Sequence, residues 1–191
     1  MQNRSLDILF SSILILITAG VVILAWLISA MAHSGKGLYL STRIGKNGVG
    51  FTIYKLRTMK ETSVQTTSVT TINNPNITKV GRFLRKTKID ELPQLWNILK
   101  GDMSFIGPRP DVAGFADKLQ GEDRIVLSIK PGITGLASIY FKNEEEILAQ
   151  QENPEAYNQQ LIWPQKIRLN KFYIKKHSCF LDLKILYKTI F

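Results

Sequence analysis

Two adjacent acids, Asp90 and Glu91, stand in the stretch of this 191-residue chain with the most chemical potential. Basic residues surround them on both sides: Arg82, Arg85, Lys86 and Lys88 upstream, and Arg109 downstream. Arg109 lies between Pro108 and Pro110, whose rings restrict the backbone. Acids in a basic neighbourhood indicate a site that handles phosphates. The acids would supply a nucleophile or a metal ligand, and the basic side chains would hold the anion.

Asp90 also fits a purely structural interpretation as a helix N-cap. Pro93 would then fall in the first turn, where a missing N–H costs nothing, and Gly101 would end the helix. Such a helix N-terminus stabilises carboxylates and attracts phosphate alike. The acid pair alone favours a cap, whereas the surrounding basic residues and the rigid Gly107-Pro108-Arg109-Pro110 run favour a site.

An uncharged apolar run extends from Ile8 to Ala32 and is long enough to cross a hydrocarbon core. A cleaved signal peptide would have a shorter apolar region of roughly 7–15 residues. We therefore predict a membrane-inserted helix over residues 1–34 and a catalytic domain over residues 35–191. A simple span would leave Arg4 outside, whereas a re-entrant hairpin bent near Gly20 would keep both flanks in the cytoplasm.

The net charge of +10 suits nucleic acid, anionic lipid or a phosphorylated substrate, and the apolar run favours the last two. Cys179 is the only cysteine, which excludes an internal disulfide and a thiolate metal cluster. His33 and His177 show no metal-ligand spacing. The sequence also lacks the glycine-rich nucleotide-binding loops of kinases and dehydrogenases.

The patterning predicts an α+β fold, mainly helical, with a small β-hairpin formed by Gly37–Arg43 and Phe51–Arg57. A polar loop would follow over Met59–Asn76, and Thr78 would cap the next helix. We expect further elements as follows: a mixed-charge helix from Arg109 to about Ile129, a tight turn at Lys130–Gly135, a solvated helix face bearing Glu144, Glu145 and Glu146, and a C-terminal helix, Phe180–Phe191, that packs in the core or lies at the membrane interface.

An ordered series of motifs runs along nearly the whole chain. The motifs are Tyr54–Met59, Gly81–Arg85, Asp90–Asn97, Lys100–Ser104, Gly107–Pro110, Lys130–Gly135 and Asp182–Ile185. Together with the N-terminal apolar run, this series resembles the monotopic polyprenyl-phosphate phosphoglycosyl transferases, a family of bacterial sugar transferases. No single motif would carry the resemblance, but the ordered set is specific.

The resemblance implies an enzyme that moves a sugar-1-phosphate from a UDP-sugar to undecaprenyl phosphate and releases UMP. Asp90 would be the nucleophile that forms a covalent phosphosugar intermediate, and Glu91, with Asp90, would bind Mg²⁺. The apolar run would be a re-entrant helix, accompanied by amphipathic interfacial helices, on the cytoplasmic face of the bacterial inner membrane. The product would begin a surface glycan or glycoconjugate. Expected partners are membrane lipids and a second copy or pathway glycosyltransferases, but no nucleic acid.

The phosphate-binding candidates are Lys55, Arg57, Arg85 and Arg109, the last with Pro108 and Pro110; solvated surface charge is the alternative for each. The chain departs from the family pattern at Ala19-Gly20, where many members have Ser-Pro, and at Asn170, where many have Asp. Glycine permits a helix break at that point, whereas proline enforces one. The segment after Gly135 also differs, and we expect it to affect the choice of sugar.

Two alternatives remain open from the sequence. A membrane-anchored, Mg²⁺-dependent nucleotide-diphosphate hydrolase would use the same acids with water as the acceptor. A non-enzymatic membrane scaffold would use Asp90 as a cap and its basic residues to bind lipid headgroups.

Overall fold

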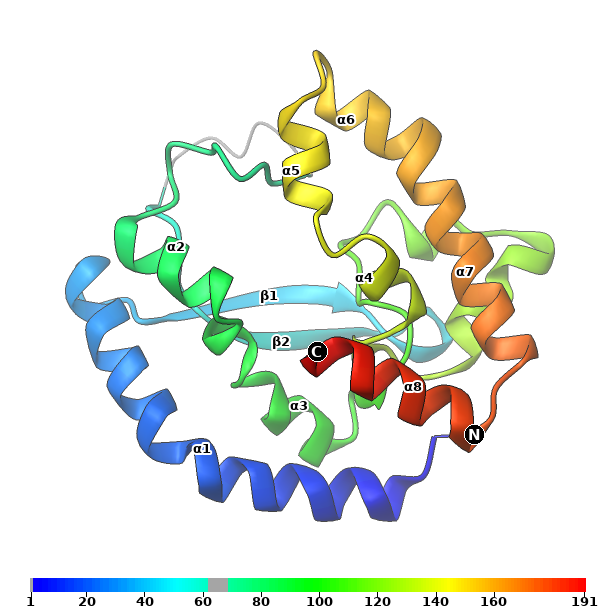
Figure 1. The fold of residues 1–191 in the computed structure, drawn as a ribbon, viewed down its shortest axis with the longest axis horizontal. Coiled ribbons are helices and arrows are strands. Elements are labelled where there is room, and N and C mark those ends of the chain that lie inside the picture. Colours follow the sequence, from blue (N-terminus) through cyan, green and yellow to red (C-terminus); the bar gives the residue numbers. More distant parts are fainter. Residues whose placement is uncertain (1, 62–68) are drawn as a thin grey trace.

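The computed structural model describes residues 2–61 and 69–191, so part of the predicted polar loop Met59–Asn76 lies outside the described residues. The fold is mainly helical with two small two-stranded sheets, which confirms the predicted α+β class (Figure 1). The helices are α1 (Arg4–Ala32), α2 (Lys79–Lys86), α3 (Gln94–Lys100), α4 (Leu136–Tyr140), α5 (Glu144–Ala149), α6 (Pro154–Tyr157), α7 (Trp163–Lys175) and α8 (Cys179–Ile190). The strands are β1 (Leu38–Ile44), β2 (Gly50–Leu56), β3 (Ser104–Ile106) and β4 (Gly132–Thr134).

The predicted hairpin is present. β1 and β2 pair antiparallel, with Leu38 opposite Leu56 and Ile44 opposite Gly50. Between them, the short 3₁₀ turn η1 (Lys46–Gly48) reverses the chain. Asn47 and Gly48 adopt left-handed φ angles of 60° and 81°, conformations that asparagine and glycine tolerate best. The turn signal in the sequence therefore marked the hairpin correctly.

α1 is one continuous helix that is long and apolar enough, by length and composition, to cross a membrane. Figure 1 shows that it bends as it runs along one side of the domain, with no interruption of the helix at Ala19 or Gly20. Thr18 Oγ donates back to the carbonyl of Leu14 at 2.7 Å, a contact that favours bending. Most of the large apolar side chains of α1 are exposed.

Both ends of α1 are bonded to the rest of the molecule. At the N-terminal end, the Arg4 guanidinium donates to the carbonyls of Ile98 and Leu99, and the buried Asp7 accepts from Ser104 Oγ at 2.9 Å. Toward the C-terminal end, Ser29 Oγ donates to the carbonyl of Arg57 at 2.7 Å. The helix is therefore docked at both ends on one body.

The segment Lys130–Gly135 is more than the predicted tight turn, because its middle residues form β4, which pairs parallel with β3. Gly107 donates its N–H to the carbonyl of Thr134, and Gly132 donates to the carbonyl of Pro108, both at 2.9 Å. A Cβ on Gly107 would stand only 2.5 Å from the Lys130 carbonyl oxygen. Two glycine-containing segments, far apart in sequence, therefore lock together by close backbone approach.

The prediction of a helix from Arg109 to about Ile129 is wrong, because this stretch forms no regular α-helix. This stretch instead forms two 3₁₀ helices, η3 (Ala116–Lys118) and η4 (Gly121–Ser128), within irregular chain. Gly114 and Gly121 have φ angles of 100° and 56°, which interrupt right-handed helix. The charge pattern looked helical, but these two backbone positions divide it.

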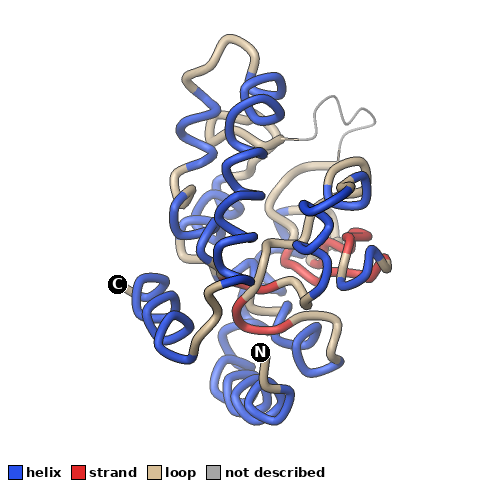
Figure 2. Tube along the Cα trace, turned by 90° about the vertical axis from the view of Figure 1, so that its right-hand side faces the viewer, coloured by secondary structure: helices blue, strands red, loops and turns tan. Residues whose placement is uncertain are grey.

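In the C-terminal third, α7 and α8 pack against β3 through Tyr173, Ile185 and Ile106. A continuous helical run joins α6 to α7 through a π-helical turn, η5 (Asn158–Ile162), and Pro164 lies in the first turn of α7. In α8, Ile185 is buried against Ile106 and Tyr173, which confirms the expected core packing. Phe180 of the same helix is exposed, and a position at the membrane interface stays a prediction. Figure 2 shows α1 and α8 at the lower end of the molecule, opposite the loop between α5 and α6.

Candidate active site

Asp90 does not cap α3, contrary to the structural interpretation of the sequence. Asp90 lies in the 3₁₀ turn η2 (Ile89–Glu91), and the residue at the N-terminal boundary of α3 is Pro93, three residues later. The turn follows Lys88, which adopts a left-handed φ of 58°. This conformation is uncommon for a residue with a side chain and occurs often at functional sites. It redirects the chain after α2 and carries Asp90 inward.

The Asp90 carboxyl group is buried and lacks a full set of partners. The residue is 6% exposed, and its Oδ1 atom has no hydrogen-bond partner among the described residues. Burial, and then the neighbouring charge of Glu91, raise the pKa of Asp90 to about 6, against the opposing influence of Lys55 and Arg85. An unpartnered buried carboxylate is costly in a folded protein, so it indicates a functional rather than a structural role.

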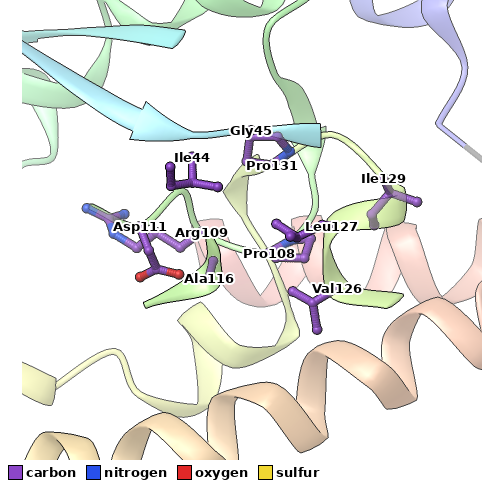
Figure 3. Close-up of a pocket in the computed structure, with 10 residues that line it drawn as sticks. All are labelled: Ile44, Gly45, Pro108, Arg109, Asp111, Ala116, Val126, Leu127, Ile129 and Pro131. Atoms are coloured by element: carbon purple, nitrogen blue, oxygen red, sulfur yellow. The ribbon is translucent and has the colours of Figure 1, made fainter. Parts of the chain in front are cut away.

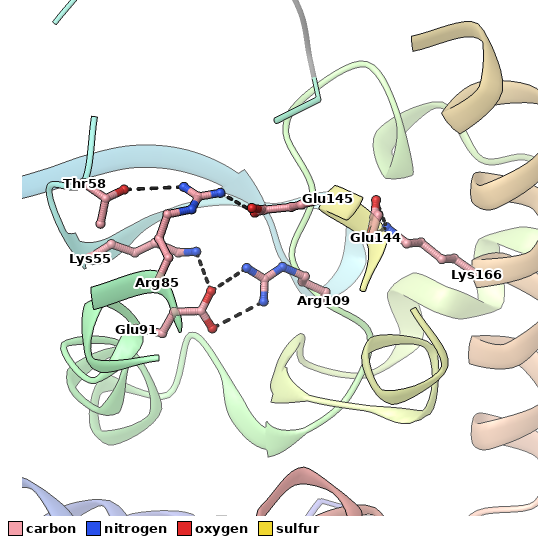
Figure 4. Close-up of polar contacts among 8 residues, drawn as sticks. All are labelled: Lys55, Thr58, Arg85, Glu91, Arg109, Glu144, Glu145 and Lys166. Atoms are coloured by element: carbon pink, nitrogen blue, oxygen red, sulfur yellow. Dashed lines mark hydrogen bonds and ion pairs between the residues drawn. The ribbon is translucent and has the colours of Figure 1, made fainter. Parts of the chain in front are cut away.

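Glu91 lies in the opposite environment. Its Oε1 accepts from Lys55 Nζ at 2.8 Å and from Arg109 Nη2 at 2.6 Å, and its side chain is 12% exposed (Figure 4). Burial acts to raise the pKa of Glu91, but Arg109 and Lys55 outweigh it and hold the pKa well below its usual range. Glu91 is therefore a fixed anion between two cations.

The paired segments of β3 and β4 position Arg109. Pro108 and Pro110 are buried, whereas Arg109 between them is exposed and reaches back to Glu91. Figure 3 shows Pro108 and Pro131 beside a small cavity that lies between the end of β1 and η4, with Arg109 and Asp111 at its rim. The prolines and the Gly107 contacts thus fix the backbone from which the guanidinium extends.

Lys55 and Arg85 reach the site from β2 and α2. Asn97 of α3 holds β2 by accepting from the N–H of Tyr54 at 3.1 Å and donating to the carbonyl of Thr52 at 2.6 Å. Gly81 allows α2 to pack closely against the backbone at Thr58, because a Cβ at this position would stand 1.9 Å from the Thr58 carbonyl oxygen. Lys55 contacts Glu91, and Arg85 donates to Thr58 Oγ1 at 3.4 Å.

Arg57 is not brought to the acid pair, although the sequence suggested it as a phosphate-binding residue. Its guanidinium lies over the ring of Tyr39, 5.9 Å from the centroid. Among the described residues its Nε has no hydrogen-bond partner. The structure therefore gathers Lys55, Arg85 and Arg109 and leaves Arg57 against an aromatic ring.

The sequence prediction missed part of the site, because two of the three acids of α5 form ion pairs, whereas Glu146 is exposed as expected. Glu144 pairs with Lys166 of α7 at 2.6 Å, and the carboxylate of Glu145 contacts the guanidinium of Arg85 (Figure 4). Beyond Arg109, burial raises the pKa of Asp111 to about 6, opposed by Lys166 and Arg43. Three consecutive acids in a strongly basic chain were the only available signal for these contacts.

The site fits a Mg²⁺ ion that the protein would share with the substrate, rather than an ion that protein side chains alone enclose. Across the described residues, no group of three or more His, Cys, Asp or Glu side chains could hold a metal. Mg²⁺ commonly uses one or two carboxylates together with waters and substrate phosphates. The unpartnered Oδ1 of Asp90 is suited to such a role, whereas Glu91 already accepts from two cations.

The structure thus combines a buried carboxylate that has an unpartnered oxygen, a neighbouring cluster of cations and an exposed apolar helix docked on the same body. The family model described as bacterial sugar transferase matches residues 1–191. The chain therefore belongs to the bacterial sugar transferase family.

Several curated proteins are similar to this chain over nearly its whole length. It is 31% identical to an undecaprenyl-phosphate galactose phosphotransferase of Salmonella typhimurium and 32% identical to a UDP-glucose:undecaprenyl-phosphate glucose-1-phosphate transferase of Escherichia coli, covering 98% and 99% of this chain. It covers only 39% of each of those proteins. It is 34% identical to the uncharacterised sugar transferase EpsL of Bacillus subtilis, covering 98% of this chain and 85% of EpsL.

Proposed function

We propose that this chain transfers a sugar-1-phosphate from a UDP-sugar to undecaprenyl phosphate and releases UMP. The observation that carries the proposal is the buried Asp90 carboxylate with an unpartnered oxygen, next to a Glu91 that two cations neutralise. The names of the relatives support the substrate classes, because they specify UDP-glucose and undecaprenyl phosphate. This chain corresponds to 39% of the length of those two relatives, and this part of them would perform the transfer.

In the first step, an oxygen of the Asp90 carboxylate attacks the phosphorus that carries the sugar. A bond forms between that oxygen and phosphorus, and the bond between this phosphorus and the bridging oxygen of the diphosphate breaks. UMP leaves with the bonding electron pair. The ionised form of Asp90 is required, and a pKa of about 6 leaves the group ionised at neutral pH.

In the second step, a phosphate oxygen of undecaprenyl phosphate attacks the same phosphorus. The bond from Asp90 breaks, the lipid diphosphate sugar forms, and the carboxylate is regenerated. Splitting the reaction into two displacements on one side chain predicts ping-pong kinetics, with UMP released before the lipid reacts.

The cations would hold the phosphates during both steps. Arg109 presents a planar guanidinium from a fixed backbone, and Lys55 and Arg85 supply charge from the other side. Mg²⁺ would be held by the unpartnered oxygen of Asp90 together with substrate phosphates, and it would neutralise charge on the diphosphate. Glu91 keeps Lys55 and Arg109 together and directed toward the site.

We also propose that α1 enters the inner leaflet of the bacterial cytoplasmic membrane and returns to the same side. Arg4 and Ser29 lie at opposite ends of the helix, yet both bond to carbonyls of one body. A straight helix that crossed the membrane would carry one end away from that body. The proposed arrangement keeps the site at the height of the acceptor phosphate.

The test of topology uses a single cysteine at Ser5, an exposed residue, in a Cys179→Ser background. Gln2 is unsuitable because its side chain bonds to Ile106 and Lys130. We expect a membrane-impermeant thiol reagent to label Ser5→Cys only after the cells are lysed. Labelling in intact cells would place the N-terminal end outside and overturn the re-entrant arrangement.

The test of function is UMP release from a panel of UDP-sugars, with and without undecaprenyl phosphate. We expect sustained UMP release with one or a few sugars, and only when the lipid phosphate is present. Equal release without lipid would indicate a hydrolase. No release from any UDP-sugar would favour a non-enzymatic scaffold.

A further inference from the structure

Glu145 of α5 forms an ion pair with Arg85, a cation close to the acid pair. The carboxylate of Glu145, in the first turn of α5, contacts the guanidinium of Arg85 (Figure 4). Arg85 is one of the charges that act to lower the pKa of Asp90, so its guanidinium belongs to the electrostatic surroundings of that carboxylate. The contact joins α5 to the surroundings of the acid pair.

The two acids that hold site arginines differ in how freely they can leave. The side chain of Glu91 is 12% exposed and is shared by Arg109 and Lys55. The side chain of Glu145 is 42% exposed and contacts Arg85 alone among the ion pairs of the described residues. A half-exposed pair of this kind contributes little to stability, so a competing anion can displace it.

The backbone beneath Glu145 is secured, so the exchange involves its side chain. Its carbonyl accepts from the N–H of Ile72, and Leu148 of the same helix is buried against Phe141 and Ile162. α5 therefore holds the carboxylate within reach of Arg85 and leaves it free to rotate away.

We propose that Glu145 is an internal substitute for substrate phosphate. Its carboxylate pairs with Arg85 before the donor binds, and the diphosphate of the donor then displaces this carboxylate from Arg85. This inference rests on the proposed function for the identity of the ligand. Glu145 thereby sets the affinity for the donor. Its role is competitive, so its removal strengthens binding of a diphosphate.

The experiment compares Glu145→Gln with Glu146→Gln in the full chain in detergent micelles. Glu146 lies in the same turn and is exposed, so its variant controls for the general loss of one negative charge. Binding of inorganic pyrophosphate and of UDP is measured by titration calorimetry. We expect Glu145→Gln to bind pyrophosphate about fivefold more tightly than the wild type, the size of a partly exposed ion pair. We expect Glu146→Gln to bind like the wild type.

A double-variant cycle assigns the effect to Arg85. In an Arg85→Gln background, Glu145→Gln should no longer change the affinity for pyrophosphate. Unchanged or weaker binding by the single Glu145→Gln variant would overturn the inference, because weaker binding would mean that Glu145 positions Arg85.

The two probes separate this inference from the proposed function. If Glu145→Gln binds pyrophosphate more tightly but the protein binds UDP no better than pyrophosphate, the result would support the role of Glu145. The same result would contradict a nucleotide-sugar donor. Lipid-dependent UMP release without an effect of Glu145→Gln would leave the function standing and overturn the inference.

Discussion

Asp90 and Glu91 are neighbours in the chain but occupy two contrasting regions of the molecule. Asp90 points into a buried region where one of its oxygens has no partner among the described residues, and its pKa is raised to about 6. Glu91 points into the cation cluster, where Arg109 and Lys55 hold its pKa far below the usual range. Two carboxylates on one turn therefore have different chemistry, because different elements surround them.

The contrast assigns separate tasks to the two acids. Asp90 keeps an oxygen available for a new bond, and its burial makes the ionised form more reactive than a solvated carboxylate. Glu91 is committed to Lys55 and Arg109, so it organises the anion-binding side chains.

Replacing Asp90 by Asn should have the largest effect. We expect UMP release to fall by roughly 10³-fold or more, because the amide cannot act as the nucleophile. The fold should survive or become more stable. The pKa of about 6 lies above the ordinary 3.8, so the ionised carboxylate costs about 3 kcal/mol once the pH has risen through 6. Thermal unfolding at neutral pH checks this. Near-normal activity would contradict the role of Asp90 as nucleophile, and a marked loss of stability would indicate a structural role.

Replacing Glu91 by Gln should lower the rate by about 10- to 100-fold, as expected for a residue that orients others in a site. Lys55 and Arg109 would lose their shared anion, and the Mg²⁺ concentration required for half-maximal rate should rise. The measurement is a Mg²⁺ titration of the initial rate, with Glu91→Asp as the conservative control and thermal unfolding to verify folding. A wild-type rate and titration curve would count against this role of Glu91 in organising the site.

The dependence on pH provides the smallest and most specific effect. The wild-type rate should rise with pH as Asp90 ionises and should reach half its maximum near pH 6. In Glu91→Gln the midpoint should move to lower pH, because a like charge is lost and Lys55 and Arg109 are left to act on Asp90. An initial-rate profile that is flat between about pH 5 and pH 7 would show that this ionisation does not limit the reaction.

Much of the fold could be predicted because its signals are local. The apolar run, the glycine-rich hairpin turn and the Thr78 cap each depend on residues close together in sequence; Thr78 Oγ1 accepts from the N–H of Gly81 as expected. The parallel pairing of β3 with β4 could not be predicted, because each strand has only three residues and periodicity needs longer segments. The pair depends on close backbone approach between distant glycines.

The site was predictable in part for the same reason. The acid pair and Arg109 stand in an unusual local composition, and the structure brings both of them together with Lys55. The contacts of Glu144 with Lys166 and of Glu145 with Arg85 join α5 to elements far away in sequence. A run of three acids on a short helix predicts a solvated surface unless the positions of its distant partners are known.

The most direct test of the central claim is the intact mass of the protein after incubation with a UDP-sugar and Mg²⁺ but no lipid. If Asp90 is the nucleophile, the wild-type protein should gain the mass of one sugar phosphate, and peptide mapping should place it on Asp90. The adduct should disappear when undecaprenyl phosphate is added, and the Asp90→Asn variant should never form it. Lipid-dependent turnover with no adduct, or with an adduct on another residue, would contradict the account.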